Sequence, residues 1–514
     1  MPYKKAKNAK RRGAHEDRPR SAKLKDCASL ANTLVHQHVP FFPFPTPNLR
    51  QIAAKSGDTM SDALGIDEHD LKAQNPRFLL RQPKALQWFE HGRLVKRHDC
   101  ERQAGRFELF LDLLYVAILS NFADALAEDI SGAKLVKYIL VLAPSWHVWS
   151  DIRELMNSFY NDDLLQRLLI LWLMAVLVVY GNNAPLVDED IGAMRAAVGS
   201  YMVARITCNL AHVVFSYADY HHRRQQRLWV GLSTICLCIY IPLYFEAVPI
   251  RGKIAAAAVA VSLEEITWIF CYCPAAKKLL RVKYSTAVDI PHEIDRFAAF
   301  YIIVLGEFLY LIVKGSNAAI GLNERLLRAV WTLVIAFCLN WLYTHADGSM
   351  DSTHPLRHNV YTAFSFAVLH LPLIASLLAG GHVAAASVAE KDFEDPQRWL
   401  LCEGLGVGMM CLYLLALVHG SQDEPGTLMM TKHVRLIMRP VTALITILLP
   451  LAHHLNATEI LSVIMAMYVA CLVWETVGSL RKGACVFEHW REIDYPEEVP
   501  QESESKGNGL EMPQ

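Results

Sequence analysis

The sequence predicts an all-α fold, a polytopic integral membrane bundle of about 12 transmembrane helices. Hydrophobic residues make up 53% of the 514-residue chain and charged residues only 20%, whereas about a quarter of an ordinary soluble protein is charged. After residue 100 the apolar residues fall into blocks of about 20, the length at which a helix crosses the hydrocarbon core of a bilayer. Both observations argue against a soluble protein and make the lipid bilayer the first expected partner.

These blocks place twelve candidate spans. They lie at approximately 107–127, 134–152, 164–182, 191–217, 228–248, 252–273, 292–313, 326–345, 358–380, 399–419, 433–455 and 459–480. Pro144 and Pro372 interrupt the second and the ninth, although a proline kinks a membrane helix without excluding it. We therefore predict four parts: a basic, largely disordered cytosolic arm (1–100), two six-helix halves (101–290 and 291–482) and an acidic cytosolic tail (483–514).

A weak internal repeat relates the two halves. An R-F-x-x-F motif opens the first span at Arg106 and the seventh at Arg296, 190 residues later. The span that follows each motif ends in tryptophan, at Trp149 in the first half and Trp341 in the second. Because six spans is an even number, both halves would have the same orientation, as in the parallel repeats of transporters.

Lysine and arginine in the short loops predict the orientation, because these residues are enriched on the cytosolic side. With the N-terminus inside, the inner loops carry eleven and the outer loops seven, and ten others lie between Met1 and Lys25. We predict that both termini are cytosolic, in the plasma membrane or an endomembrane. The net charge of −1 gives no reason to expect a nucleic acid partner, and an oligomer is compatible with the sequence.

Metal and cofactor sites are not expected. The twelve cysteines contain no C-x-x-C pair, so the sequence indicates neither a metal site nor a disulfide framework. His147, His212, His370 and His419 lie in predicted helices at spacings that fit no haem or metal clamp. We interpret them as core histidines with satisfied hydrogen bonds.

Charged residues inside the predicted spans are the strongest indication of function, because an acid near a helix centre costs roughly 2.5–3.5 kcal/mol to insert. Arg205, Glu264 and Glu307 fall near the middle of three spans. We predict a buried polar network in which Arg205 is balanced by Glu264 or Glu307 and which serves as an ion or proton relay. Helix packing alone is the competing explanation.

Two further carboxylates lie in the first span. Glu108 and Asp112 are four residues apart and therefore share one helix face. Glu108, one turn inside the membrane, is expected to reach the interface, with Arg106 as its neutralising partner. Asp112, one turn deeper, is the better functional candidate and is expected to face water. The candidate transport network is therefore Asp112, Arg205, Glu264 and Glu307.

The stretch F-E-L-F-L-D-L-L-Y-V, which starts at Phe107, resembles the first-helix signature "ELFFDLVFVF" of the bacterial low temperature requirement A family. The block from His292 to Glu307 is similar to the family's "H-x-x-E-R-F … I-x-L-G-E" element, and W-L-Y from Trp341 is similar to its "W-W-L-Y-F" segment. The resemblance covers roughly residues 105–480, with aspartate at 295 where the family usually has glutamate. The long arm indicates a fungal-type member. The matching positions are Arg106, Phe107, Glu108, Asp112, His292, Asp295, Arg296, Gly306, Glu307, Trp341 and Tyr343.

The resemblance implies a multi-pass membrane protein linked to growth at low temperature, and it supplies no reaction. From the intramembrane charges we predict a transporter or channel-like carrier of a small solute or ion, with proton coupling as one mode. The alternative is a non-transporting membrane scaffold or sensor for cold or stress. An enzyme is not expected, because the sequence contains no Walker, kinase, G-x-S-x-G or H-E-x-x-H pattern.

Overall fold

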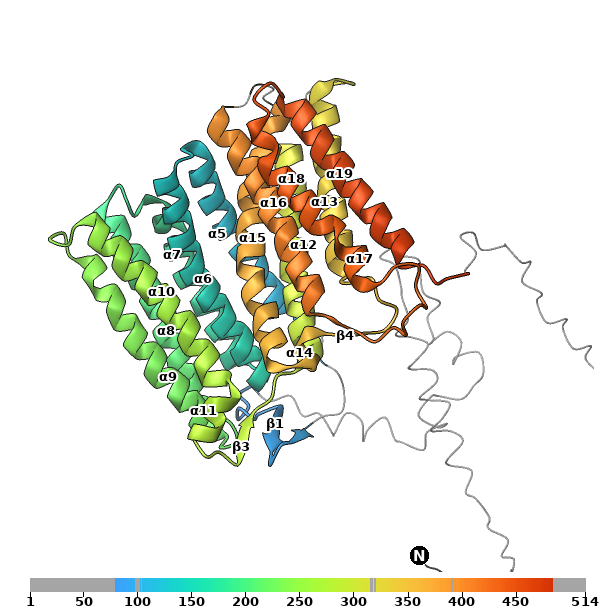
Figure 1. Ribbon diagram of the computed structural model, residues 1–514. Helices are drawn as coiled ribbons and strands as arrows, with labels where there is room; N and C mark the ends of the chain where they lie inside the picture. Colours follow the sequence, from blue (N-terminus) through green and yellow to red (C-terminus); the bar gives the residue numbers. More distant parts are fainter. Residues whose placement is uncertain are drawn as a thin grey trace, which may run out of the picture. The chain divides into compact units, whose positions relative to one another are not determined.

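A computed structural model describes residues 79–97, 102, 104–314, 318, 320–389, 392 and 394–483 (Figure 1). The predicted basic arm up to residue 78 and the predicted acidic tail after residue 483 lie outside the described residues. Within these ranges the chain is a bundle of long helices that run alternately up and down in Figure 1. The all-α, polytopic fold class is therefore confirmed.

The first half comprises six helical segments, which begin and end close to the predicted spans. They are α5 (Arg106–Glu128), α6 (Gly132–Phe159), α7 (Leu164–Asn183) with η1 (Ala184–Leu186), α8 (Ile191–Ala218), α9 (Arg223–Leu237) with η2 (Cys238–Tyr244), and α10 (Ile250–Tyr272). The short helix α11 (Pro274–Leu279) follows α10. Side-chain caps from Ser131, Asp163 and Asp190 begin α6, α7 and α8, because each accepts a backbone N–H of the first turn.

The second half has the same number of long segments in the described ranges. They are α12 (Ile290–Val313), α13 (Glu324–Thr344), α15 (Val360–Ala389), α16 (Asp395–Val418), α17 (Lys432–Leu436) continued by α18 (Met438–Leu448) and η4 (Leu449–Leu451), and α19 (Ala457–Gly478). The short helix α14 (Pro355–His358) precedes α15. Pro144 and Pro372 lie inside the unbroken helices α6 and α15.

Ten of these segments are long and apolar enough to cross a membrane by length and composition. The other two predicted spans, α6 and α8, form helices of 28 residues but do not meet that standard. α6 carries five charged residues, and α8 is rich in small and polar ones. Both pack among other helices of the bundle, where polar side chains can contact protein instead of lipid.

Both halves follow one packing plan, as the predicted repeat implies. In the first half α5 packs on α6 and α7, and in the second α12 packs on α13 and α15. The α6–α8 and α6–α10 contacts correspond to α13–α16 and α13–α19. The chains of neighbours α7–α8–α9–α10 and α15–α16–α18–α19 also correspond. The halves meet where α5 and α6 pack on α12 and α15.

Helices α15 and α16 approach each other closely at two glycines. A Cβ atom built on Gly404 would lie 2.6 Å from the Cα atom of Gly380, which is shorter than any van der Waals contact. Only glycine at these positions permits this approach, so the glycine-rich stretch near residue 404 serves packing.

A small sheet covers the end of the bundle at which α5 begins. β1 (Gln87–Glu90) pairs antiparallel with β2 (Arg93–Lys96) and with β3 (Tyr284–Thr286), so that Trp88 lies opposite both Val95 and Thr286. The prediction of a largely disordered arm to residue 100 is therefore wrong for residues 79–97. The hairpin is ordered because Trp88 packs in an apolar cluster with Phe159 of α6 and Phe215 of α8. The short strands β4 (Ser352–Thr353) and β5 (Gly420–Ser421) pair at the same end.

Candidate functional site

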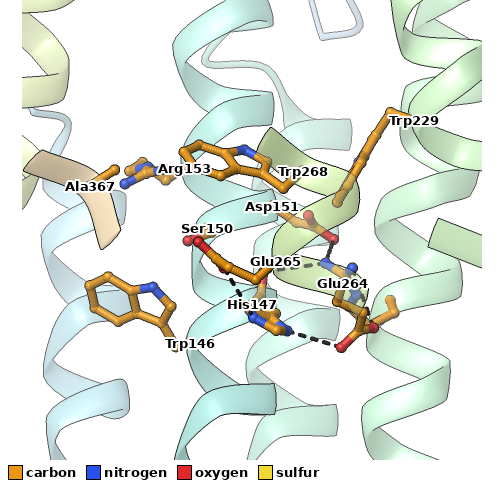
Figure 2. Close-up of a pocket in the computed structure, with 11 residues that line it drawn as sticks. Trp146, His147, Ser150, Asp151, Arg153, Trp229, Glu264, Glu265, Trp268 and Ala367 are labelled. Carbon is orange, nitrogen blue, oxygen red and sulfur yellow. Dashed lines mark hydrogen bonds and ion pairs between the residues drawn. The ribbon is translucent and has the colours of Figure 1, made fainter. Parts of the chain in front are cut away.

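A buried charged cluster lies where three helices of the first half meet. α8 contributes Arg205, α6 contributes Asp151 and His147, and α10 contributes Glu264 (Figure 2). Arg205, Asp151 and Glu264 are each at most 2% exposed. The Arg205 guanidinium donates a hydrogen bond to the Asp151 carboxylate, and its Nη2 lies 3.5 Å from Oε1 of Glu264. Arg205 is therefore held between two acids inside the bundle.

Glu264 has further polar partners on three neighbouring elements, α6, α8 and η2. Nδ1 of His147 lies 3.0 Å from its Oε2, and the hydroxyls of Tyr201 and Tyr240 donate to its carboxylate at 2.7 and 3.0 Å. Nε2 of His147 lies 3.5 Å from the carboxylate of Glu265, which is 31% exposed. His147 thus connects the enclosed Glu264 to a carboxylate that is open to its surroundings.

Two acids of this cluster face one arginine, so its charges balance when one further proton is bound, at His147 or at one of the acids. Asp151 and Glu264 carry two negative charges and Arg205 one positive charge, and uncompensated charge is costly in a low-dielectric interior. Histidine is the side chain that changes charge most readily near neutral pH. The arrangement can therefore take up or release one proton at His147 or Glu264 without any covalent change.

Glu264 lines one pocket, and two of its hydrogen-bond partners line a second. The first, here the charged pocket, is lined by the cluster itself and by Trp146, Trp229 and Trp268. The second, here the apolar pocket, lies between α6, α8 and α10 and is lined by Tyr201 and Tyr240, which donate to Glu264. Its cavity volume is about 210 Å³, which is below the roughly 300–1,000 Å³ of sites for drug-sized ligands and suits a smaller molecule.

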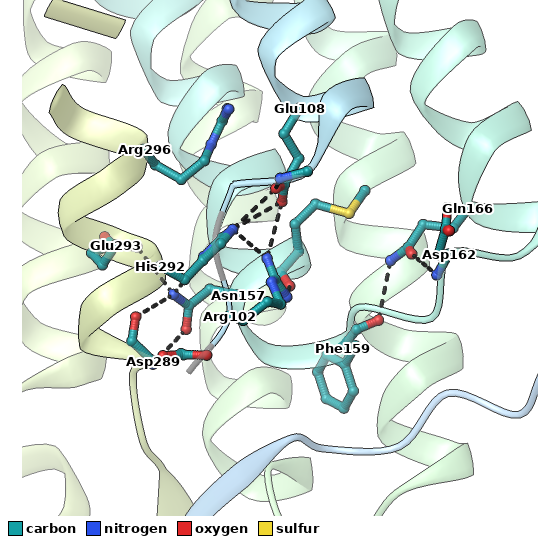
Figure 3. Close-up of polar contacts among 12 residues, drawn as sticks. Arg102, Glu108, Asn157, Phe159, Asp162, Gln166, Asp289, His292, Glu293 and Arg296 are labelled. Carbon is teal, nitrogen blue, oxygen red and sulfur yellow. Dashed lines mark hydrogen bonds and ion pairs between the residues drawn. The ribbon is translucent and has the colours of Figure 1, made fainter. Parts of the chain in front are cut away.

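A second set of charges joins the two halves. On α5, Glu108 and Asp112 are one turn apart, and on α12 so are His292 and Arg296. Figure 3 shows Glu108 facing His292. Nε2 of His292 lies 3.1 Å from the Glu108 carboxylate, and Arg296 donates two hydrogen bonds to Asp112 at 2.6 and 2.7 Å. Trp149 of α6 donates to Asp112 at 2.8 Å. The two motifs that carry the family resemblance, on α5 and on α12, therefore contact each other directly.

Two predictions about this pair are wrong. Glu108 is 2% exposed and packs inside the protein instead of extending outward, and its cationic partner is Arg102, at 3.1 Å, and not the exposed Arg106. Asp112 is fully buried against Arg296 and does not face water. The predictions failed because they treated α5 as a single helix, whereas α12 covers the face that carries both acids.

Polar side chains from α6 extend this contact between the halves. Asn157 accepts a hydrogen bond from the backbone N–H of Asp289 at 2.8 Å, and its amide lies 3.3 Å from Glu293. Nε of Arg153 lies 3.2 Å from the other carboxylate oxygen of Glu293. The guanidinium of Arg153 also stacks on Phe297 at 4.4 Å, so Arg153 is a buried residue of the helix and not the loop charge counted from the sequence.

Glu307 lies away from Arg205. It accepts a hydrogen bond from Ser120 of α5 at 2.6 Å, and Ser120 lies 3.2 Å from Nε2 of His382. The other ring nitrogen of His382 is 2.8 Å from Asp124, which is 51% exposed. The structure therefore brings Arg205 and Glu264 together, but it places Asp112 in the contact between the halves and Glu307 in a separate group of side chains.

The remaining motif positions have mostly structural contacts. Tyr343 stacks on Tyr301 with ring centroids 4.1 Å apart, and its hydroxyl lies 3.1 Å from His370. Phe107 lies under the guanidinium of Arg167 at 4.7 Å. Trp341 is 42% exposed. Asp295 and Gly306 are on exposed faces of α12.

The sequence interpretation missed several residues of the cluster. Asp151 was not singled out, and His147 was interpreted as an ordinary core histidine. Their separation of four residues in a helix with many charges is the signal that could have identified them. A second buried pair, Arg439 of α18 and Glu475 of α19, was also missed. Among the other histidines, His212 is fully buried with no hydrogen-bond partner in the described residues, so the prediction that it is satisfied is wrong.

Comparisons with known proteins identify the family of this chain. Residues 103–473 match the family described as "Bacterial low temperature requirement A protein (LtrA)". The chain belongs to the LtrA family. It is also similar to Uncharacterized protein RA0937 of Rhizobium meliloti (strain 1021), with 23% identity over 306 residues that cover 56% of this chain and 70% of that protein. No solved structure matches the chain.

The LtrA match begins just before α5 and ends within α19, so it covers both halves but not the β1–β2 hairpin. The predicted resemblance is confirmed, and with it the multi-pass membrane protein. The fungal-type assignment stays a prediction. The family description concerns a requirement at low temperature and names no reaction.

Proposed function

We propose that this LtrA protein is a secondary transporter of a small solute or ion, coupled to protons, and that Glu264 and His147 form the coupling site. The observation that carries the proposal is the place of Glu264 between two pockets. It lines the charged pocket with His147 and Arg205, and it accepts hydrogen bonds from Tyr201 and Tyr240, which line the apolar pocket. We propose that the two tyrosines separate Glu264 from the apolar pocket in this state and that their movement would open it to that side, as alternating access requires.

The contact between the halves supports the same function. In transporters built from repeats, one half rocks against the other around a fixed site. The Glu108–His292 and Asp112–Arg296 pairs join α5 to α12 and can form in one arrangement of the halves and break in another. We propose that these pairs position the halves and do not bind the transported solute.

We propose that the end of the bundle with the β1–β2–β3 sheet faces the cytosol, together with both termini. The sheet end carries Arg223 and Arg224, and Lys277 and Lys278 follow in α11. An excess of lysine and arginine marks the cytosolic side. The membrane is the plasma membrane or an endomembrane, and the protein is proposed to act without a cofactor, a metal or enzymatic chemistry.

Proton-dependent flux is the direct test. The full chain is reconstituted into liposomes that contain a pH-sensitive dye, and small cations, organic acids and amino acids are added in turn under an imposed pH gradient. The wild type is expected to move protons only with its solute. Glu264→Gln should abolish this flux, and the exposed Glu246→Gln should not.

The alternative, a membrane scaffold or sensor, predicts a different result. In that case the wild type moves neither protons nor any solute of the panel, and Glu264→Gln changes only the thermal stability of the protein in detergent.

A further inference from the structure

We infer that the apolar pocket binds an organic anion that has a hydrocarbon body, with its anionic group on Lys253. Binding at this pocket does not depend on the proposed transport. The solute class rests on the proposed function: if the protein is a transporter, the ligand class of this pocket is also the class of the transported solute. The reason is that Tyr201 and Tyr240, at the far end of the pocket, donate hydrogen bonds to Glu264. The inference is carried by a lysine without an acid partner, whose stem is buried in the wall of an apolar pocket and whose ammonium lies at its mouth.

Lys253 lies in the first turn of α10 and lines the apolar pocket. Its side chain is 8% exposed, and the described part of the chain places no acid within ion-pair distance and no hydrogen-bond acceptor against it. Its Nζ is not among the fully buried polar atoms that lack a hydrogen-bond partner, so the ammonium is accessible at the mouth of the pocket while its stem is buried. It lies in the first turn of α10, where the helix dipole disfavours a cation and an anion bound beside it is stabilising.

The other two lysines at the mouth already have partners. Nζ of Lys134 and Nζ of Lys137 lie 2.9 and 2.6 Å from the carboxylate of Asp188. Partial burial alone would raise the pKa of Asp188, but the hydrogen bonds from Lys137 and Lys134 lower it overall. Asp188 is therefore ionised at neutral pH and neutralises one lysine charge. Lys134 also lies 3.7 Å from Glu189 and 4.0 Å from Asp129. Of the three lysines at the mouth, Lys253 is the one without an acid partner among the described residues.

The walls below the mouth fit a hydrocarbon. Val141 and Pro144 of α6, Val198 of α8 and Ala257 of α10 line them. The tyrosines at the far end do not offer free hydroxyls, because Tyr180 donates to the carbonyl of Val141 and Tyr201 and Tyr240 donate to Glu264. A ligand there meets aromatic rings and aliphatic side chains, so its buried part must be apolar.

The pocket also sets a length. Lys137 and Pro144 are seven residues apart on α6, which corresponds to about 10 Å along the helix. A medium-chain monocarboxylate such as octanoate fits this depth with its carboxylate at the mouth. The exposed side chains of Ile250 and Ile254 line the same pocket, so one wall opens toward lipid. An anionic phospholipid could present the same chemistry, a single anionic group on a hydrocarbon chain.

The test is calorimetric titration of the detergent-purified full chain with octanoate, with octanol and with a short-chain phosphatidylglycerol. Octanoate is expected to bind the wild type, and Lys253→Gln should weaken it by about 30-fold or more, as for a buried charge pair that loses one member. The matched control is Arg251→Gln, an exposed cation in the same helical turn, which should leave the affinity unchanged. Octanol lacks the charge, so its binding should not depend on Lys253.

The titrations with octanoate and with phosphatidylglycerol distinguish a free carboxylate from a lipid as the ligand of this pocket. Octanoate binding that requires Lys253 indicates a free carboxylate, whereas phosphatidylglycerol binding that requires Lys253 and resists octanoate indicates a lipid. A second variant, Ala257→Phe, fills the pocket and should abolish binding of all three probes in a protein that remains monodisperse. Equal octanoate affinity in wild type and Lys253→Gln, or no binding of any anion, overturns the inference even if the liposome assay detects proton flux.

Discussion

The two halves share one packing plan but use their buried arginines differently. In the second half, Arg439 donates to both oxygens of Glu475 at 2.7 Å and to the carbonyls of Leu412, Leu342 and Ala346. Every nitrogen of its guanidinium has a partner. In the first half, Nε of Arg205 has no hydrogen-bond partner in the described residues, and Nη2 approaches Glu264 only to 3.5 Å.

This difference separates a structural pair from a group that can change state. A saturated charge pair holds its helices in one arrangement, because any movement breaks several hydrogen bonds inside a low-dielectric interior. The Arg205 cluster has an unsatisfied donor, a titratable histidine and pockets on two sides, so its partners can exchange at lower cost. We therefore expect the second half to be the rigid one and the first half to bind and respond.

The largest effect is expected at Arg439. Arg439→Met leaves Glu475 buried without its partner and should reduce the free energy of unfolding by about 5 kcal/mol, the upper end of the range for broken buried pairs. Thermal unfolding in detergent measures this loss. The control Arg439→Met/Glu475→Gln removes both charges and should recover most of the stability and any transport activity. If Arg439→Met is as stable as the wild type, then the Arg439–Glu475 pair does not hold the second half together, and the proposed difference between the halves is wrong.

Arg205→Met should cost somewhat less, about 3 kcal/mol, because Glu264 retains His147, Tyr201 and Tyr240 as partners. The rescuing change is Asp151→Asn, since Asp151 is the acid that Arg205 contacts directly. We expect the double variant to unfold near the wild-type temperature but to have no proton-coupled flux. A double variant that transports normally would assign the Arg205 cluster to packing as well.

The contact between the halves should show an intermediate effect. Asp112→Asn keeps an acceptor for Arg296 and Trp149 but removes the negative charge. It should reduce the free energy of unfolding by about 2 kcal/mol. Scanning fluorimetry of the purified protein measures it. Glu307→Gln is the comparison, because Ser120 can donate to an amide oxygen as well as to a carboxylate, and its stability should change little. Equal losses in both variants would show that Arg296 does not depend on the charge of Asp112.

The smallest effect is expected at Asp219, which lies outside the spans. Partial burial raises its pKa, but hydrogen bonds from the backbone N–H groups of His221 and Ala85 and from the His221 ring lower it overall. The folded protein then binds fewer protons at Asp219 than the unfolded chain does. Its contribution is complete above the unfolded pKa of about 3.9 and is lost as the pH falls through the folded pKa.

Asp219→Asn should therefore reduce stability by about 1 kcal/mol at neutral pH and should make the β1–β2 hairpin more accessible to protease. The difference from the wild type should shrink in acid. A difference in unfolding temperature that is the same at pH 7 and pH 3.5 would exclude the ionised Asp219 as its cause.

The helices could be predicted from the sequence because apolar blocks of membrane length are a local property. Glu264 was identifiable for the same reason, since a carboxylate in the middle of such a block is conspicuous. Its partners were not, because the pairing of Asp151 with Arg205 and of Asp112 with Arg296 depends on which helix faces which. The members of these pairs are 54 and 184 residues apart in the chain. A single sequence does not show which faces of two distant helices pack together. The hairpin at residues 87–96 was hidden because its burial comes from α6 and α8.

The position of β3 has a consequence for the order in which the chain assembles. β1 precedes the first helix, but one of its two partner strands lies at Tyr284–Thr286, between α11 and α12. During synthesis one edge of β1 therefore has no partner strand until the chain has been made as far as Thr286. The third strand then closes a loop of almost two hundred residues, and such distant contacts form late because their closure entropy is high. Completion of this sheet therefore requires the whole first half of the chain.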